Sequence, residues 1–557
     1  MRQTKEMGTA IVRLLEAIIL LCPKLFFILH TTKKEVNSMW NKRRALIGGV
    51  SLCVLIATSV WFVRNHDENN TPLFSNGDSS YGVSSSNPIA VDVGMKVLKD
   101  GGNAVDAAIA VSYALGVVEP YGSGIGGGGG MLIAKEGEEP TFIDYREVAP
   151  SSLEGKTGVP GFVAGMEYVN KKYGTTSMTK LIDPAIEYAE KGFKVDELLA
   201  SRLFYASGRM DVSNLSSFFP RGEAIKAGEE LKQPELAEQL TYIKQNGAAG
   251  FYQKDIANRL AEETSISLED LQEYEVEERQ PVVSTYKGNE IIAAPPPFSG
   301  ITVIQMLKMM EKENVNINEQ EVDYKAIKKI KEIAYADRVK EISDPAFYPQ
   351  DVERFLSDEY IESLLENSEK REVEGADQEH ESTTHFVVID KEGTTVSTTN
   401  TLSNFFGLGK QVDGFFLNNN ADTYGSIGVN NPEPGKRART FTAPLIIRKE
   451  GEWVMGVGTP GGTRIPQVLN QVLARHFQGG EELEKAVETP RFIFDQDTLY
   501  IEPTTPEEVI EQMSAFDVQS KTSDVYYGGI QLLVKDLGNG RITGVGDSRR
   551  NGVWKHS

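Results

Sequence analysis

The segment His380-Glu381-Ser382-Thr383-Thr384-His385-Phe386-Val387-Val388-Ile389-Asp390 decides the fold of this chain. A charged, polar run that starts near Glu366 ends at Ser382 and leads directly into an apolar strand at Thr383. Further strand patterns follow at 395–399 and 415–417, whereas residues 160–370 show mostly helical patterns, interrupted by a strand and turn at 291–300. The chain therefore has two halves that meet at residue 382, and strands of both halves can share one core.

The same segment indicates a nucleophile. If the chain is cut before Thr383, the hydroxyl and the new α-amine belong to one residue, and an α-amine with a pKa of about 7.7–8.0 can serve as the base for that hydroxyl. Thr401 is expected on a neighbouring strand, within hydrogen-bonding reach of the Thr383 hydroxyl. The run 458–464 contains Gly461 and Gly462, whose adjacent N–H groups suit an oxyanion hole. Each feature alone has a plainer explanation, since Thr-Thr is common in strands and Pro-Gly-Gly in turns.

The half before residue 382 begins with two predicted helices. Asn87 and Pro88 form a helix start, and this helix should run to Asp100. Asn103 should cap a second helix that runs to about Val117 and is apolar nearly all round, which indicates burial. The glycine-rich run 122–130 then leads into a strand at 131–134, followed by another at 141–145. Nucleotide-binding glycine loops lead into a helix, so this run favours close backbone packing or a wall beside a substrate.

These features resemble the γ-glutamyltranspeptidase family of N-terminal-nucleophile hydrolases across residues 81–557. The matching runs occur in the family's order: 101–108, 122–130, 144–147, 158–161, 294–297, 383–386, 461–462 and 546–552. The resemblance implies an α+β fold, a four-layer αββα sandwich. It also implies self-cleavage between Ser382 and Thr383 into a large subunit, 81–382, and a small subunit, 383–557, that stay associated as a heterodimer.

The resemblance assigns roles to particular residues. Thr383 would be the nucleophile, first in cutting its own chain and then in forming a γ-glutamyl ester, with assistance from Thr401. The N–H groups of Gly461 and Gly462 would hold the oxyanion. Arg146 would bind a substrate carboxylate, and Asn419 would contact the substrate.

The sequence departs from the common, glutathione-using members of the family. Aligned on Asn418 and Asn419, the acidic residue that grips a free glutamyl α-amine is replaced by Thr423, with Asp422 one place off. The paired serines of those members correspond to the run 439–444, Arg-Thr-Phe-Thr-Ala-Pro. Loss of the amine-binding acid suits a glutamyl unit whose amine is amide-linked, as inside a γ-linked polymer.

These departures, with the runs 436–441 and 549–555, resemble the poly-γ-glutamate capsule depolymerase branch, which cuts the polymer and can transfer it to peptidoglycan. In that branch, arginines matching Arg464 and Arg550 contact the carboxylates of the polymer, as bidentate pairing allows. Internal ion pairs with the many Asp and Glu residues are the alternative for both arginines. His380 and His385 flank the cut, and a strand and linker role is favoured because an N-terminal threonine carries its own base.

Three functions follow. The leading one is an extracellular enzyme that cleaves poly-γ-glutamate through a Thr383 acyl-enzyme and passes the fragment to water or to a cell-wall amine. The second is a glutathione-type γ-glutamyltranspeptidase or amide acylase, which the missing acid disfavours. The third is a processed but inactive surface protein that binds acidic polymer, which intact Thr383, Thr401, Gly461 and Gly462 disfavour.

Residues 45–63 form an uncharged apolar stretch, preceded by Lys42-Arg43-Arg44. At about 1.5 Å per residue this stretch approaches the thickness of a bilayer core, and its basic flank should stay cytoplasmic. We expect an uncleaved transmembrane anchor at 45–63, with 1–44 inside, a linker at 64–80 and the body at the cell surface. A cleaved signal peptide is the alternative, and Met39 offers a second start that would make 1–38 an over-extension.

Charge and composition exclude several partners. The formal net charge is −22, although residues 1–64 are basic, so the body is strongly acidic and should repel nucleic acid. The two cysteines, Cys22 and Cys53, both precede the body, which rules out thiolate metal sites there. The six histidines are scattered without metal-binding spacing. Neither a metal nor a cofactor is therefore expected.

Overall fold

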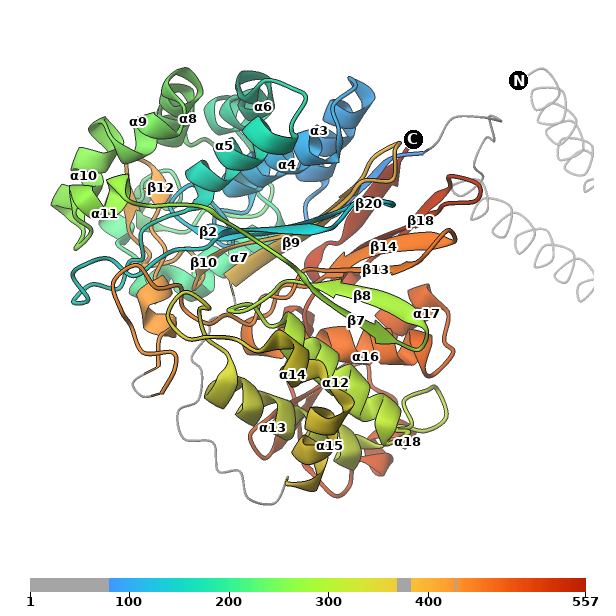
Figure 1. Ribbon diagram of the computed structural model, residues 1–557. Coiled ribbons are helices and arrows are strands. Elements are labelled where there is room, and N and C mark those ends of the chain that lie inside the picture. Colours follow the sequence, from blue (N-terminus) through green and yellow to red (C-terminus); the bar gives the residue numbers. More distant parts are fainter. Residues whose placement is uncertain (1–79, 368–381, 426–427) are drawn as a thin grey trace, which may run out of the picture. The chain divides into compact units, whose positions relative to one another are not determined.

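Two antiparallel sheets lie face to face at the centre of the computed structural model, which describes residues 80–367, 382–425 and 428–557 (Figure 1). The larger sheet has seven strands in the order β20-β1-β9-β10-β2-β3-β6, and the smaller has six in the order β19-β18-β14-β13-β8-β7. In the same order, the larger sheet comprises Val553–His556, Gly82–Ser85, Ser382–Ile389, Thr395–Ser403, Gly128–Ala134, Thr141–Tyr145 and Glu277–Arg279. The smaller comprises Ile542–Gly546, Gln531–Asp536, Trp453–Gly458, Leu445–Lys449, Asn289–Ala293 and Val282–Tyr286.

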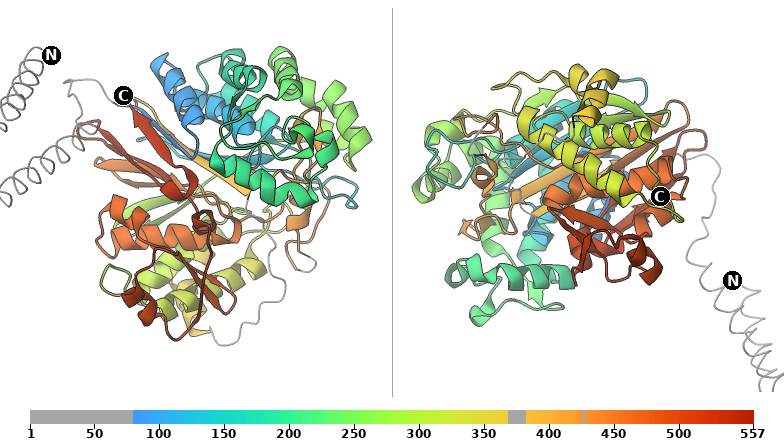
Figure 2. Two further views of the ribbon diagram at one scale, coloured as in Figure 1. Left: turned by 180° about the vertical axis from the view of Figure 1, so that it is seen from behind. Right: turned by 90° about the horizontal axis from the view of Figure 1, so that it is seen from below.

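Helices cover the outer face of each sheet, which gives the layer order helix, sheet, sheet, helix (Figures 1 and 2). The larger sheet is covered by α3 (Pro88–Lys99), α4 (Ala104–Val118), α5 (Phe162–Tyr173), α6 (Met178–Lys191) and α8 (Pro234–Asn246). The smaller is covered by α12 (Gly300–Lys312), α13 (Tyr324–Glu341), α16 (Ile465–Phe477) and α17 (Leu483–Glu488). The predicted αββα sandwich is confirmed.

Strand β9 lies inside the larger sheet and has two buried faces. Phe386 and Val388 join the core formed with the helices, whereas Val387 and Ile389 pack against β18 and β19 of the other sheet. Side chains alternate between the faces of a strand. Thr384 therefore faces the helical layer, and Thr383 faces the second sheet.

The first two predicted helices are confirmed. Asn87 accepts a hydrogen bond from the N–H of Ile89 at 3.0 Å, and Pro88 opens α3. Asn103 and Asp106 form a capping box at the start of α4, which is buried along almost its whole length. The two helices position the chain for the turn that leads into the glycine-rich run.

The glycine-rich run forms the start of β2, three residues earlier than predicted. Its glycines permit close approach of three backbones. A Cβ on Gly126 would lie 2.2 Å from the carbonyl oxygen of Phe416, and one on Gly127 would lie 2.3 Å from that of Thr401. The predicted close backbone packing is confirmed, and it places the run beside the end of β10.

Residues 1–79, which include the predicted anchor and linker, and residues 368–381, which include His380, lie outside the described residues. In the ranges that are described, no helix combines the length and the apolar character needed to cross a membrane.

Candidate active site

Thr383 and Thr401 face each other across the pair of strands β9 and β10, and both are buried. The hydroxyl of Thr401 donates to the carbonyl oxygen of Ser382 at 2.6 Å and accepts the N–H of Ser403 at 2.9 Å. The predicted position on a neighbouring strand is confirmed. In the uncut chain, however, the acceptor for Thr401 is the carbonyl of the peptide bond before Thr383, instead of the Thr383 hydroxyl.

Gly461 and Gly462 follow the end of β14, which packs face to face with β9. A Cβ on Gly456 would lie 2.5 Å from Val387, and a Cβ on Gly458 would lie 2.3 Å from the ring of His385. Two residues forward along β14 therefore correspond to two residues back along β9, and β14 ends opposite His385, two residues after Thr383. Gly461 and Gly462 have positive φ values of 146° and 57°, which glycine adopts without strain.

Arg146, directly after β3, reaches the same end of the larger sheet. Its guanidinium donates to Glu147 at 3.2 Å and to the side-chain oxygen of Asn420 at 2.7 Å. That oxygen also accepts the hydroxyl of Ser403 at 3.3 Å, which connects Arg146 to the residue that binds Thr401. Within the described part of the chain, Nη1 of Arg146 and Nδ2 of Asn420 are buried without a hydrogen-bond partner. Two adjacent donors of this kind suit a substrate carboxylate.

β10 is distorted where these contacts begin. The register between β9 and β10 shifts between Thr401 and Ser403, and Ser403 has a φ of 73°. A bulge of this kind redirects side chains, and left-handed backbone at a non-glycine residue is found at functional sites. Here it directs the Ser403 hydroxyl toward Asn420.

Asn419, the predicted substrate contact, makes internal hydrogen bonds. Its oxygen accepts the N–H of Asn404 at 2.8 Å, and its nitrogen donates to Asp422 at 3.2 Å. Thr423, at the position of the family's amine-binding acid, donates to the carbonyl of Asn420 at 2.6 Å. It is Asn420, missed by the sequence analysis, that contacts Arg146; the run of three asparagines was the only signal for it.

Glu119, a second residue that the sequence analysis missed, holds the start of β9 from the helical side. It accepts the hydroxyl of Thr384 at 2.9 Å and that of Ser86 at 2.7 Å. The backbone after Glu119 turns so that the carbonyl oxygen of Tyr121 accepts a hydrogen bond from the hydroxyl of Ser382. Burial raises the pKa of Glu119 to about 7, although the hydrogen bonds from Ser86 and Thr384 lower it in part. Its position at the end of α4, just before the glycine-rich run, was the available signal.

His385 is neutral and structural in this arrangement. Its Nδ1 lies 2.9 Å from the hydroxyl of Thr399, and its ring fills the space left by Gly458. Burial lowers its pKa to about 3. The described contacts therefore place His385 in the packing between the sheets, as the strand role predicts.

Arg464 and Arg550 lie on the side of the second sheet. Arg464 ends the turn Gly462–Arg464, and its guanidinium carbon lies 4.3 Å from the ring centre of Tyr526. Arg550 donates to the carbonyl of Val525 at 3.0 Å, with its stem packed on Gly529. Both are buried.

The arginines of the run 436–441 have internal roles. Arg437 pairs with Asp144 at 3.3 Å, and Arg439 donates to three carbonyls at the end of α13 and just after it. These contacts bind the run to the sandwich.

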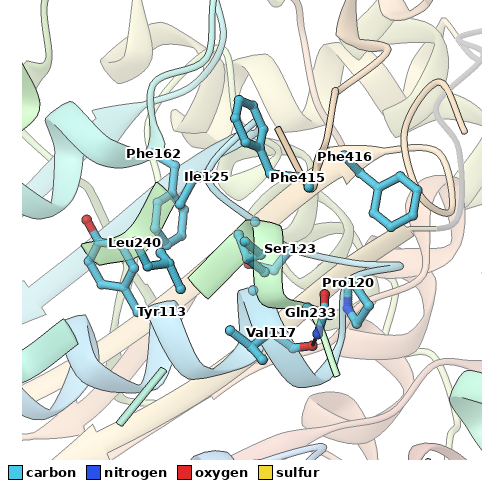
Figure 3. Close-up of a pocket in the computed structure, with 14 residues that line it drawn as sticks. Tyr113, Val117, Pro120, Ser123, Ile125, Phe162, Gln233, Leu240, Phe415 and Phe416 are labelled. Atoms are coloured by element: carbon cyan, nitrogen blue, oxygen red, sulfur yellow. Dashed lines mark hydrogen bonds between the residues drawn. The ribbon is translucent and has the colours of Figure 1, made fainter. Parts of the chain in front are cut away.

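A cavity of about 10 Å³ lies beneath the glycine-rich run, lined mainly by apolar side chains from α4, α5, α8 and β12 (Phe415–Phe416) (Figure 3). The side-chain amide of Gln233 belongs to the cavity wall and donates a hydrogen bond to the carbonyl of Val117 at 2.8 Å. This volume admits about one water molecule. It is a packing gap and too small for a substrate.

Comparisons with known proteins show the family of the chain. Residues 90–556 match the family model described as gamma-glutamyltranspeptidase. The chain belongs to the γ-glutamyltranspeptidase family. It is 48% identical over 518 residues to the capsule biosynthesis protein CapD proenzyme of Bacillus anthracis, which covers 91% of this chain and 96% of that protein.

The glutathione hydrolase proenzyme of Bacillus subtilis is 33% identical over 532 residues, covering 85% of this chain and 90% of that protein. The cephalosporin acylase structure from Bacillus halodurans superposes with a TM-score of 0.77 at 24% identity, covering 87% of this chain and 98% of that one, and supports the fold. As a member of the γ-glutamyltranspeptidase family, the protein is a γ-glutamyl transferase or hydrolase.

Glu119 should make stability depend on pH. Because burial raises its pKa to about 7, the folded state binds a proton on this carboxyl more tightly than the unfolded chain does. The stability that this proton contributes is lost as pH rises through 7. The free energy of unfolding of the wild type should fall relative to that of Glu119→Gln between pH 5 and pH 8, by up to roughly 3 kcal/mol. Urea unfolding at both pH values measures this difference.

The control is Glu508→Gln, which removes the same charge from an exposed position. An equal effect of pH on the wild type and on Glu119→Gln would contradict the assignment of a raised pKa to Glu119.

Proposed function

We propose that this protein is a self-processing γ-glutamyl hydrolase and transferase that cleaves poly-γ-glutamate through an ester on Thr383. The observation that carries the proposal is the 2.6 Å hydrogen bond from Thr401 to the carbonyl oxygen of Ser382, next to Thr383. It places a donor on the peptide oxygen that must carry negative charge when the chain is cut.

Self-cleavage follows from this contact. The Thr383 hydroxyl oxygen attacks the carbonyl carbon of Ser382, and the Thr401 hydroxyl stabilises the developing oxyanion. The C–N bond breaks, the nitrogen takes the proton that the hydroxyl loses and becomes the α-amine of Thr383, and an ester joins Ser382 to the Thr383 side-chain oxygen. Water then cleaves the ester, which leaves a new carboxylate on Ser382 and a free hydroxyl on Thr383.

Turnover uses the same atoms. The new α-amine accepts the proton of the Thr383 hydroxyl as it attacks the γ-carbonyl of a glutamyl unit. The N–H groups of Gly461 and Gly462 hold the oxyanion, while Arg146 and Asn420 bind the α-carboxylate of that unit. The bond to the leaving nitrogen breaks, the nitrogen takes the proton, and the γ-glutamyl ester remains on Thr383 until water or an amine attacks it.

We favour a polymer as the substrate because position 423, where glutathione-using members of the family have an acidic residue, is a threonine. Thr423 is buried there and donates to the backbone, while Asp422 lies 3.5 Å from Lys156 and also accepts from Asn419. At position 423, a free glutamyl ammonium group would therefore meet a neutral hydroxyl that already donates its hydrogen bond to the backbone, and no carboxylate. An internal unit of a γ-linked polymer has no such ammonium, and the 48% identical relative is named for capsule biosynthesis.

One of the two alternatives has specific support. A glutathione-type transpeptidase is favoured by the 33% identical relative that is named glutathione hydrolase. An inactive polymer-binding surface protein would need no nucleophile, and the arrangement around Thr383 and Thr401 disfavours it. The acceptor of the γ-glutamyl group is water or a cell-wall amine.

The N-terminal sequence supports a location at the cell surface. A single-pass anchor at 45–63 would hold the body, including the heterodimer of residues 81–382 and 383–557, at the outer surface of the membrane. Protease added to intact cells should then degrade the body and spare a cytoplasmic marker protein. Full protection of the body would contradict this location.

The polymer assignment predicts shortening of poly-γ-glutamate by protein that begins at residue 65. The wild type should yield two fragments that separate at Thr383 and should shift the polymer to smaller sizes on a sizing column. Thr383→Ala should remain one chain and leave the polymer unchanged, because both reactions need the hydroxyl.

Two fragments from Thr383→Ala would refute the nucleophile. A wild type that is cut at Thr383 but leaves the polymer intact would point to a small γ-glutamyl donor instead.

A further inference from the structure

The turn 119–123 follows α4 and passes along the start of β9 on the helical side. It is a tight turn, because the carbonyl of Glu119 accepts the N–H groups of Gly122 at 2.9 Å and of Ser123 at 3.2 Å. All of its residues are buried. The turn therefore lies inside the core, where it can fix the residues that it contacts.

The turn binds both neighbours of Thr383. Side chains alternate along β9, so Ser382 and Thr384 point to the helical side while Thr383 points to the second sheet. The carbonyl oxygen of Tyr121 accepts the hydroxyl of Ser382. A side-chain oxygen of Glu119 accepts the hydroxyl of Thr384 at 2.9 Å. One turn thus holds the residues on both sides of the nucleophile.

A third contact lies between these two hydrogen bonds. A Cβ on Gly122 would lie 3.4 Å from the carbonyl carbon and oxygen of Thr383, so the turn packs directly against the peptide that follows the proposed cut. The three contacts fall on the backbone and on the helical face of residues 382–384. The Thr383 hydroxyl lies on the opposite face of the strand, away from the turn.

The same turn is bound to the segment that follows Thr401. The carbonyl oxygen of Tyr121 also accepts the N–H of Phe406 at 3.0 Å. The ring of Tyr121 packs edge to face against Phe405 and Phe406, with 6.3 and 6.2 Å between ring centres. Phe405 follows two residues after Ser403, whose N–H donates to the Thr401 hydroxyl. The turn therefore connects the peptide to be cut with the segment that carries its hydrogen-bond donor.

Glu119 anchors the turn through its second carboxyl oxygen. That oxygen accepts the hydroxyl of Ser86 at 2.7 Å, directly before the N-cap of α3. Because the carboxyl is fixed by Ser86, its bond to Thr384 allows that side chain one position. Loss of the Thr384 hydroxyl would leave a buried oxygen of Glu119 without this partner, which is unfavourable.

We propose that the turn 119–123 positions the peptide bond between Ser382 and Thr383 for self-cleavage, and that Glu119 acts as a positioning residue through Thr384. Attack of a side chain on the carbonyl of its own preceding residue needs one orientation of both residues, and holding that orientation lowers the barrier. The turn contributes no reacting atom, since the proton, the leaving nitrogen and the ester all belong to Ser382 and Thr383. The proposal rests on the self-cleavage step of the proposed function.

The test follows self-cleavage of the full-length chain after a short pulse of labelled amino acid in cell-free translation with detergent micelles. The uncut and cut forms are separated on a denaturing gel. Thr384→Val keeps the shape of the side chain and removes the hydroxyl that Glu119 binds. It should slow self-cleavage about tenfold, the effect of one hydrogen bond to a buried carboxyl. Glu119→Ala should slow it by at least the same factor.

Thr398→Val is the matched control. Thr398 lies opposite Phe386 in the pairing of β9 with β10, so it is buried on the helical face of the same sheet. Within the described part of the chain its hydroxyl has no hydrogen-bond partner. Thr398→Val should therefore self-cleave at the wild-type rate. An equal rate for Thr384→Val and Thr398→Val would overturn the proposal.

Two further variants separate positioning from a general loss of stability. Glu119→Ala combined with Thr384→Val should be no slower than Glu119→Ala alone, because both changes break the same bond. Glu119→Gln should self-cleave at close to the wild-type rate, since the amide has the shape of a protonated carboxyl and can still bond both hydroxyls. Multiplied effects in the double variant, or a rate for Glu119→Gln as low as that of Glu119→Ala, would contradict a positioning role.

The same samples distinguish this proposal from the proposed function. If the wild type is cut at Thr383 and Thr384→Val is cut equally fast, the positioning role fails alone. If Thr384→Val slows the cut but the cut wild type leaves poly-γ-glutamate intact, the polymer assignment fails and the positioning role stands. A wild type that is not cut at all would refute self-cleavage, and the positioning role with it.

Discussion

The pairing of β9 with β10 is the constraint on which the rest of the site depends. It sets Thr383 opposite Thr401, so that the Thr401 hydroxyl reaches the carbonyl of Ser382. Because side chains alternate along β9, the same pairing turns Thr383 toward the second sheet and Thr384 toward Glu119. A register slip of one residue would exchange the two threonines between faces and remove the site.

The surroundings of this pair combine satisfied and unsatisfied buried polar groups. On the helical side, Glu119 holds Thr384 and Ser86 by direct hydrogen bonds. On the side of the proposed substrate site, Nη1 of Arg146 and Nδ2 of Asn420 lack hydrogen-bond partners among the described residues. Leaving buried donors unpaired costs about 1–3 kcal/mol each, which a bound carboxylate would recover. The hydrogen bonds that support β9 thus need no ligand, and the two unpaired donors would be available to a bound carboxylate.

Much of this could be predicted from the sequence, because the signals were local. The caps at Asn87 and Asn103, the strand at Thr383 and the strand after the glycine-rich run each depend on neighbouring residues. The contacts of Glu119 with Thr384, and of Asn420 with Arg146, join residues more than 250 positions apart. No local pattern marks such pairs. The two β-strands within 282–293 were only partly anticipated, because β7 is a partly exposed edge strand.

The most direct test of the central claim is the mass of the small subunit, residues 383–557, after acid quench of a reaction with poly-γ-glutamate. An ester on Thr383 predicts a population heavier by whole glutamyl units, with the added mass on the N-terminal peptide and lost on mild alkaline treatment. No added mass during active polymer cleavage, or added mass on another peptide, would contradict an acyl-enzyme at Thr383.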